Sequence, residues 1–260
     1  MAFQLLSEAL DAYQEGGVPR VVEEAARFVN NVFSLTYNPA VPPVGIEFRT
    51  VRIEIGHQGK YLYNDVGRNV VPDPGDTVVE AGVHRGNDTA TFAKFANRVV
   101  GFEPSPRNHS IAEQNLRKFE NVDVVNNGLW FEADELEIMY GGDDYDDGFL
   151  QPDDGGQERG EQIPVDTLEA YVEQLDIDHV DFLKVEAEGA EVEILEGMGE
   201  LRPRHVVVNA DEERDGQPIG VEVMELLQPM GYTLVAVKLG HILFFTLEDV
   251  DHYAFRNEFE

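Results

Sequence analysis

Hydrophobic positions change their period along the first part of the chain. Over residues 3–33 they recur at helical spacing, as at Leu6 and Leu10, which predicts two amphipathic helices. Over residues 45–63 they alternate with polar positions, which predicts a β-hairpin or an edge ribbon. We therefore expect residues 1–70 to form an accessory segment of helices and a hairpin that precedes the main domain.

Residues 71–260 show short apolar runs that alternate with helical patterns. The patterns predict strands at 77–81, 98–102, 122–130, 180–186, 205–210, 233–238 and 242–246, and helices at 88–96, 105–119, 165–175, 190–197 and 221–230. Such alternation predicts an α/β fold with a doubly wound, mostly parallel seven-stranded sheet. The last two strands follow each other closely, so we expect them to form an antiparallel hairpin.

Charge and composition narrow the surroundings in which this domain works. The chain of 260 residues carries 51 acidic and 19 basic residues, a net charge of -32. A surface of this kind disfavours nucleic acid and anionic membranes as partners. Because molar salt shortens the Debye length to about 3 Å and suppresses self-repulsion, we infer adaptation to a salt-rich cytoplasm. The acids are spread along the chain, which argues against an acidic surface that docks on one basic partner.

Cysteine usage and the N-terminal sequence point to a soluble, cytoplasmic protein. The chain has no cysteine, which excludes disulfides, a thiolate nucleophile and cysteine-based zinc sites. The first residues lack the basic and apolar regions of a signal peptide, and no apolar run approaches the roughly 18 residues of a spanning helix.

A glycine turn and a distal acid carry the first chemical signal. Gly82 and Gly86 follow a predicted strand, and Glu103 ends the next strand about 20 residues further on, where a ribose-binding acid belongs. This predicts an adenosine-containing cofactor. The turn lacks the three glycines of a dinucleotide fingerprint, and Glu80 would repel a pyrophosphate but suit the cationic groups of S-adenosylmethionine. We therefore favour S-adenosylmethionine over NAD.

A second cluster of charged residues ends the strand predicted at 180–186. Strand alternation places Lys184 and Glu186 on one face, so these two side chains can pair. Glu188 follows, and Glu191 falls in the first turn of the next helix, where the helix dipole favours an acid. Charged groups at the cofactor edge of a sheet are candidates for acid, base or substrate-orienting roles.

Residues 141–160 are rich in Asp, Gly and Gln, which predicts a long surface loop beside the cofactor-binding crevice expected at the edge of the sheet. Its aspartates at positions 143, 144, 146 and 147 do not follow the spacing of a calcium-binding loop, and no glutamate falls in register. We expect no metal site here, but a solvated loop that folds over substrate.

Four motifs together resemble the FkbM family of S-adenosylmethionine-dependent methyltransferases, whose fold is the Rossmann-like class I sheet. The family forms are close to D-x-G-A-N-x-G, F-E-P, V-D-T-L and L-K-x-D-x-E-G-x-E. This chain has E-A-G-V-H-R-G from Glu80, F-E-P from Phe102, V-D-T-L from Val165 and L-K-V-E-A-E-G-A-E from Leu183. The resemblance covers roughly residues 76–200.

The resemblance also implies roles for individual residues. Glu80, Gly82 and Gly86 would line the methionine end of the donor, and Glu103 would hold the ribose hydroxyls. The adenine would lie near Asn127 and Gly128. This chain departs from the family pattern where Glu80 and Glu186 replace Asp and where His84 replaces Asn. Each glutamate keeps the charge on a longer arm. His84 either replaces the hydrogen bonds of the amide, which we favour, or serves as a base.

The family resemblance implies O-methylation of a small molecule or a sugar-containing acceptor. For a hydroxyl acceptor, Glu186 or His84 would accept the proton and Lys184 would tune the carboxylate, with Glu188 as a further candidate. For a carboxylate acceptor no base is needed, and Arg85 or Arg107 would bind the anion. Two alternatives remain: an NAD-dependent oxidoreductase, and a catalytically silent module that binds the donor.

Overall fold

The computed structural model describes residues 60–65, 68–140, 148, 158–214 and 216–249. The chain divides into two compact units, Met1–Lys60 and Tyr61–Glu260, and the described residues belong almost entirely to the second. The helices predicted at 3–33, most of the predicted ribbon and most of the acidic loop lie outside the described residues. The accessory segment predicted at 1–70 therefore stays a prediction.

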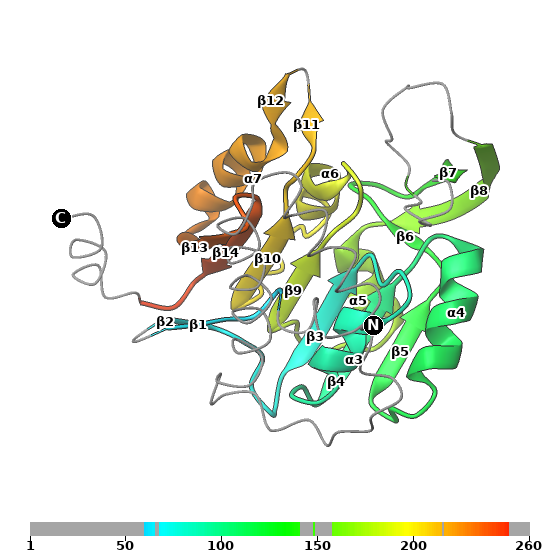
Figure 1. The fold of residues 1–260 in the computed structure, drawn as a ribbon, viewed down its shortest axis with the longest axis horizontal. Coiled ribbons are helices and arrows are strands. Elements are labelled where there is room, and N and C mark those ends of the chain that lie inside the picture. The colour runs from blue at the N-terminus through cyan, green and yellow to red at the C-terminus, as the bar shows by residue number, and fades with distance from the viewer. Residues whose placement is uncertain (1–59, 66–67, 141–147, 149–157, 215, 250–260) are drawn as a thin grey trace, which may run out of the picture. The chain divides into compact units, whose positions relative to one another are not determined.

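The second unit is built on a seven-stranded sheet (Figure 1). Its strands, in chain order, are β3 (Thr77–Ala81), β4 (Arg98–Phe102), β5 (Val122–Val125), β9 (Phe182–Val185), β10 (His205–Asn209), β13 (Thr233–Lys238) and β14 (Ile242–Thr246). The spatial order is β13-β14-β10-β9-β3-β4-β5, and β14 runs antiparallel to the other six strands. The predicted fold class and the closing antiparallel hairpin are confirmed.

Strand order places the topological switch point of the sheet between β3 and β9. From β3 the chain builds outward through β4 to β5, and it then returns to lay β9 on the other side of β3. At such a switch point the loops after neighbouring strands turn away from each other, which leaves a ligand-binding crevice at the carboxyl edge of the sheet. The residues after β3, β4 and β9 therefore face one site.

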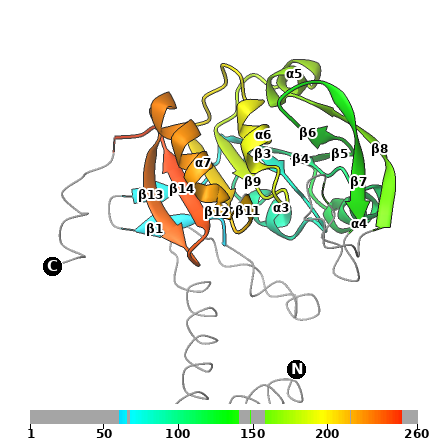
Figure 2. The same cartoon turned by 90° about the horizontal axis from the view of Figure 1, so that it is seen from above.

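Because side chains alternate along each strand, the sheet contributes to two hydrophobic cores, one on each face. In β3, Val79 and Ala81 join a core with helices α5 (Leu168–Gln174), α6 (Glu191–Glu196) and α7 (Ile219–Leu227). Val78 joins the opposite core, which includes residues of and just after α3 (Asn87–Phe92). Helix α4 (Pro106–Leu116) packs over a smaller cluster on that side. Figure 2 shows α5 and α4 on opposite faces of the sheet.

A strand predicted over residues 122–130 is wrong as one element. It breaks after Val125, and β6 (Gly128–Leu129) pairs with β8 (Glu158–Asp166) in a separate three-stranded sheet that β7 (Asp134–Tyr140) completes. The break has a local cause: the Asn126 side chain donates to the Glu103 carbonyl at 2.8 Å and to the Pro104 carbonyl at 3.1 Å, which turns the chain out of the main sheet. The last three residues of the predicted loop 141–160 belong to β8.

Two helix boundaries shift because of capping. The helix predicted at 165–175 begins at Leu168, since the Thr167 hydroxyl accepts the Ala170 amide at 3.0 Å and caps it. The residues before Thr167 end β8. In the same way Ser105 caps α4, so that this helix begins at Pro106. After α7 a short 3-10 helix, η1 (Gln228–Met230), completes the predicted segment.

Two small hairpins flank the main sheet. Strands β1 (Tyr63–Asp65) and β2 (Arg68–Val70) pair antiparallel, and Tyr61, Leu62 and Val70 lie in the core on the α3 side. Strands β11 (Glu213–Arg214) and β12 (Gln217–Pro218) form the other hairpin, ahead of α7. Within the described residues, no helix has the length and apolar character needed to cross a membrane.

We predict that His205 makes stability depend on pH. Its ring on β10 is 3% exposed, Nδ1 has no partner among the described residues, and burial, aided by Arg204, lowers its pKa to about 4. Between pH 6.5 and 4, His205 is protonated in the unfolded chain but stays neutral in the folded protein. The free energy of unfolding therefore falls as the pH falls through this interval. His205→Phe should remove up to about 3 kcal/mol of that loss in urea unfolding.

His241→Gln, in the turn before β14, provides the control and should keep the wild-type slope. Parallel stability curves for wild type and His205→Phe between pH 4 and 6.5 would contradict the prediction.

Candidate active site

Glu80 and Lys184 face each other across the switch point. They are register partners on the adjacent parallel strands β3 and β9, and alternation turns both toward the α3 side of the sheet, as it does Val78 and Phe182. Lys184 is 1% exposed and Glu80 is fully buried. A charged pair therefore lies inside the sheet-helix interface, directly below the glycine turn.

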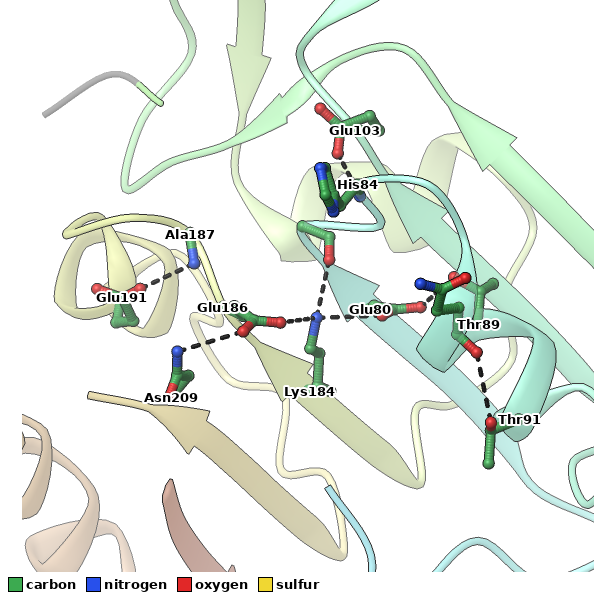
Figure 3. Close-up of polar contacts among 12 residues, drawn as sticks. Glu80, His84, Thr89, Thr91, Glu103, Lys184, Glu186, Ala187, Glu191 and Asn209 are labelled. Carbon is green, nitrogen blue, oxygen red and sulfur yellow. Dashed lines mark hydrogen bonds and ion pairs between the residues drawn. The ribbon is translucent and has the colours of Figure 1, made fainter. Parts of the chain in front are cut away.

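The ammonium of Lys184 binds three oxygen atoms (Figure 3). Nζ lies 3.1 Å from Glu80 Oε1 and 3.0 Å from Glu186 Oε2, and it donates to the Gly82 carbonyl at 2.8 Å. Burial disfavours the charged form of Lys184, but the carboxylates of Glu186 and Glu80 outweigh burial and raise its pKa.. Lys184 is therefore a fixed cation that joins β3, the turn and the end of β9. The pairing of Lys184 with Glu186 expected from alternation is confirmed.

Glu80 points into the protein. Its second carboxylate oxygen, Oε2, accepts the Thr89 hydroxyl of α3 at 2.6 Å, and burial raises its pKa. Because Lys184 compensates its charge, Glu80 does not present a free carboxylate to a ligand. Glu103 and Glu186 follow neighbouring strands at the same edge of the sheet, so the electrostatic preference inferred from Glu80 depends on acids such as these instead.

The glycine turn is shaped by its contact with the end of β9. Gly82 has φ +82°, and a Cβ on it would lie 1.8 Å from the carbonyl oxygen of Glu186. Gly86 has φ +86° and precedes α3, and a Cβ there would meet Leu116 at 2.8 Å. His84 between them also has a positive φ, 53°. The turn can close against β9 only with glycine at position 82.

Glu103 holds the turn from the other side. It is 3% exposed at the end of β4, and its two carboxylate oxygens accept backbone amides from the turn and from the start of α4: His84 N at 2.6 Å and Ser105 N at 2.9 Å. The structure therefore brings Glu103 and the glycine turn together, as their spacing predicted. His84 lies half-buried in this turn.

Asn127 and Gly128 lie in the connection from β5 to the small sheet. Asn127 is half-buried, and its side chain is hydrogen-bonded to the Tyr171 phenol, an interaction that partly offsets the burial that raises the Tyr171 pKa. Gly128 is buried in β6, opposite Val165. Their neighbour Asn126 binds the Glu103 carbonyl, which the sequence analysis missed. Its position directly after β5 was the signal.

Glu186 is the partly accessible carboxylate of the second cluster. Its side chain is 26% exposed, and while Oε2 binds Lys184, Oε1 accepts the amide of Asn209 at 3.2 Å. Asn209, at the end of β10, also donates to Asp211 at 3.1 Å. Sequence reasoning missed Asn209, although a polar residue that ends a run of three valines was a signal.

Glu188 and Glu191 follow Glu186 in a tight turn. Glu188 has φ +50° and is half-buried. Glu191 is 1% exposed, it accepts the Ala187 amide at 2.8 Å, and burial raises its pKa to about 7. Glu191 therefore stabilises the turn. In the described part of the chain no group of three or more His, Asp or Glu side chains is arranged to hold a metal ion.

The matching family model is the methyltransferase FkbM domain, which aligns with residues 80–234. This is more than half of the chain, and the chain belongs to the FkbM methyltransferase family. The matched residues contain the turn, Glu103, Lys184 and Glu186. Comparison of the sequence with curated proteins finds no match.

Several solved structures are similar to this chain at low sequence identity. An FkbM methyltransferase from Methylobacillus flagellatus KT has 16% identity and a TM-score of 0.47, over 68% of this chain and 44% of that one. An rRNA methylase from Streptococcus thermophilus has 17% identity and a TM-score of 0.41, over 70% and 90%. Fibrillarin from Aeropyrum pernix, with bound S-adenosylmethionine, has 13% identity and a TM-score of 0.46, over 68% and 69%.

This chain spans less than half the length of the first of these structures. Membership of the family confirms the predicted methyltransferase and its cofactor, S-adenosylmethionine.

Gly82→Ala should damage both folding and donor binding. The substitution combines an unfavourable positive φ, at about 1–2 kcal/mol, with a clash against the Glu186 backbone. We expect donor affinity in calorimetry to fall at least about tenfold and the unfolding free energy to fall by several kcal/mol.

Gly240→Ala is the matched control, since Gly240 has φ +86° and open space around its Cα. Gly240→Ala should lower the unfolding free energy only by the cost of a positive φ in alanine, and donor affinity should stay unchanged. Equal effects of the two substitutions would show that the clash is unimportant.

Proposed function

We propose that the protein is an O-methyltransferase that acts on a hydroxyl group of a small-molecule or sugar-containing acceptor. The observation that carries the proposal is the position of the Glu186 carboxylate and the partners that hold it. Its side chain is a partly exposed carboxylate that Lys184 and Asn209 hold in place. Its backbone carbonyl packs against Gly82 of the glycine turn. A group so fixed is suited to accept a proton from a positioned acceptor.

The residues present fit the methyl donor. The turn from Gly82 to Gly86 would accommodate its methionine end, and Glu103 would hold the ribose, because a buried carboxylate beside the turn already accepts two backbone amides and keeps lone pairs for hydroxyls. Asn127 would lie near the adenine. When bound, the donor supplies a methyl group on a sulfonium. Glu80 would contribute by positioning, since it is fully buried and paired.

For a hydroxyl acceptor the protein has to orient the oxygen and remove its proton. Glu186 would take the proton at one carboxylate oxygen while Lys184 and Asn209 keep the carboxylate in place. Lys184 would not touch the acceptor, because its ammonium is buried among three protein oxygens. His84 would act through the turn, where its amide binds Glu103.

The acceptor is expected to be other than nucleic acid. With a net charge of -32, association with a polyanion lacks the electrostatic contribution on which such binding depends. An uncharged hydroxyl acceptor avoids this repulsion. Assays belong at molar KCl, where self-repulsion within the protein is screened.

Glu186→Gln should lower methyl transfer while donor binding persists. Loss of a general base reduces turnover by at least about 100-fold, whereas S-adenosylmethionine affinity should stay within about threefold. The measurement is release of S-adenosylhomocysteine at molar KCl with a panel of methyl glycosides and the corresponding uronic acids.

Glu196→Gln, exposed at the end of α6, is the control and should match wild type. Transfer to uronic acids alone, or full activity of Glu186→Gln, would contradict the proposed base. If wild-type protein binds the donor but methylates no member of the panel, the proposed acceptor class is wrong.

A further inference from the structure

Tyr61 lies beside the ion cluster although it precedes the matched family domain. The match covers residues 80–234, yet Tyr61 is 1% exposed and packs in the core on the α3 side of the sheet. This is the face onto which Lys184 and Glu80 project. A tyrosine from the segment before β1 therefore reaches the centre of the domain.

The ring of Tyr61 lies against the ammonium of Lys184. The distance from Lys184 Nζ to the ring centroid is 4.9 Å, within the range of a cation–π contact. The three hydrogen-bonding partners of Nζ are Glu80, Glu186 and the Gly82 carbonyl. The aromatic face is a fourth neighbour that limits where the ammonium can move.

The phenol of Tyr61 shares this environment. Burial, followed by the negative charge of Glu186 and by a hydrogen bond between the phenol and the Glu186 carboxylate, raises the pKa of Tyr61, and Asp88 and Glu80 act in the same direction. The side chain therefore stays neutral beside two carboxylates. A neutral aromatic group can occupy this position without compensating the charges that hold Lys184.

The next residues of the same segment are held at a different place. Lys238 of β13 donates to the Leu62 carbonyl, and its Nζ lies 5.9 Å from the Tyr63 ring centroid. Tyr63 also contacts Phe244 at a centroid distance of 5.7 Å. Tyr61 and Tyr63 thus lie two residues apart but contact different lysines: the Tyr61 ring lies against Lys184, and the Tyr63 ring against Lys238.

We propose that Tyr61 is a positioning residue of the methyltransferase site: its ring fixes the Lys184 ammonium and, through the Gly82 carbonyl, the turn that receives the donor. The inference rests on the proposed use of that turn for S-adenosylmethionine. Residues ahead of the family domain are then required for a correctly shaped donor site, and the domain begun at residue 80 is incomplete.

The test compares S-adenosylmethionine affinity in four full-length proteins by calorimetry at molar KCl, well below each melting temperature. Tyr61→Leu removes the ring and should weaken donor binding about 5- to 30-fold. Tyr61→Phe keeps the ring and should restore affinity to within about twofold of wild type. Tyr63→Leu, the matched control on the same ribbon, should lower the melting temperature but leave donor affinity unchanged.

Three results would overturn the inference. One is wild-type affinity in folded Tyr61→Leu, and another is an equal loss of affinity in Tyr63→Leu, which would indicate general loosening of the ribbon. The third concerns Tyr61→Phe. Failure of Tyr61→Phe to restore binding would show that the ring is not the group responsible. Failure of the wild-type protein to bind the donor would instead overturn the function on which the inference rests.

Discussion

The structure depends on keeping the buried ammonium of Lys184 charged. Removing an ion from water is unfavourable by several kcal/mol unless close partners replace its hydration. Glu80, Glu186 and the Gly82 carbonyl provide those partners within 3.1 Å. Each comes from a different part of the sheet edge: β3, the end of β9 and the turn between β3 and α3. Satisfying one cation therefore fixes the relative positions of the elements that form the crevice.

This arrangement separates support from chemistry. Glu80 occupies the position before the turn where the family has an acid. One of its carboxylate oxygens pairs with Lys184, and the other accepts the Thr89 hydroxyl. Glu103 and Glu186 lie at the crevice, where they fit the proposed ribose and acceptor roles. The contacts of the buried Lys184 ammonium are short. Molar salt screens the acidic surface but leaves these contacts largely intact. The fold can therefore carry a high surface charge and keep a precise site.

Local sequence patterns predicted the central strands and the glycine turn because each is defined by a few consecutive residues. They also predicted that Lys184 and Glu186 pair, since alternation alone places both on one face. The contact of Lys184 with Glu80 was not predictable in this way, because it requires β9 to lie beside β3, 104 residues away. Strands β7 and β8 were missed, because the alternation of Leu136 and Ile138 with glutamates ends at Met139, and Ile163 is followed by Pro164 and Val165.

The most direct test of this account is the coupling free energy between Glu80 and Lys184 in a double-mutant cycle. Urea unfolding at molar KCl would be measured for wild type, Glu80→Gln, Lys184→Met and the double variant. Breaking a buried pair from one side is expected to remove about 3–5 kcal/mol, whereas removing both charges together removes much less than the sum. A coupling of about 2 kcal/mol or more is predicted. Additive effects would show that the Lys184 cluster does not organise the site.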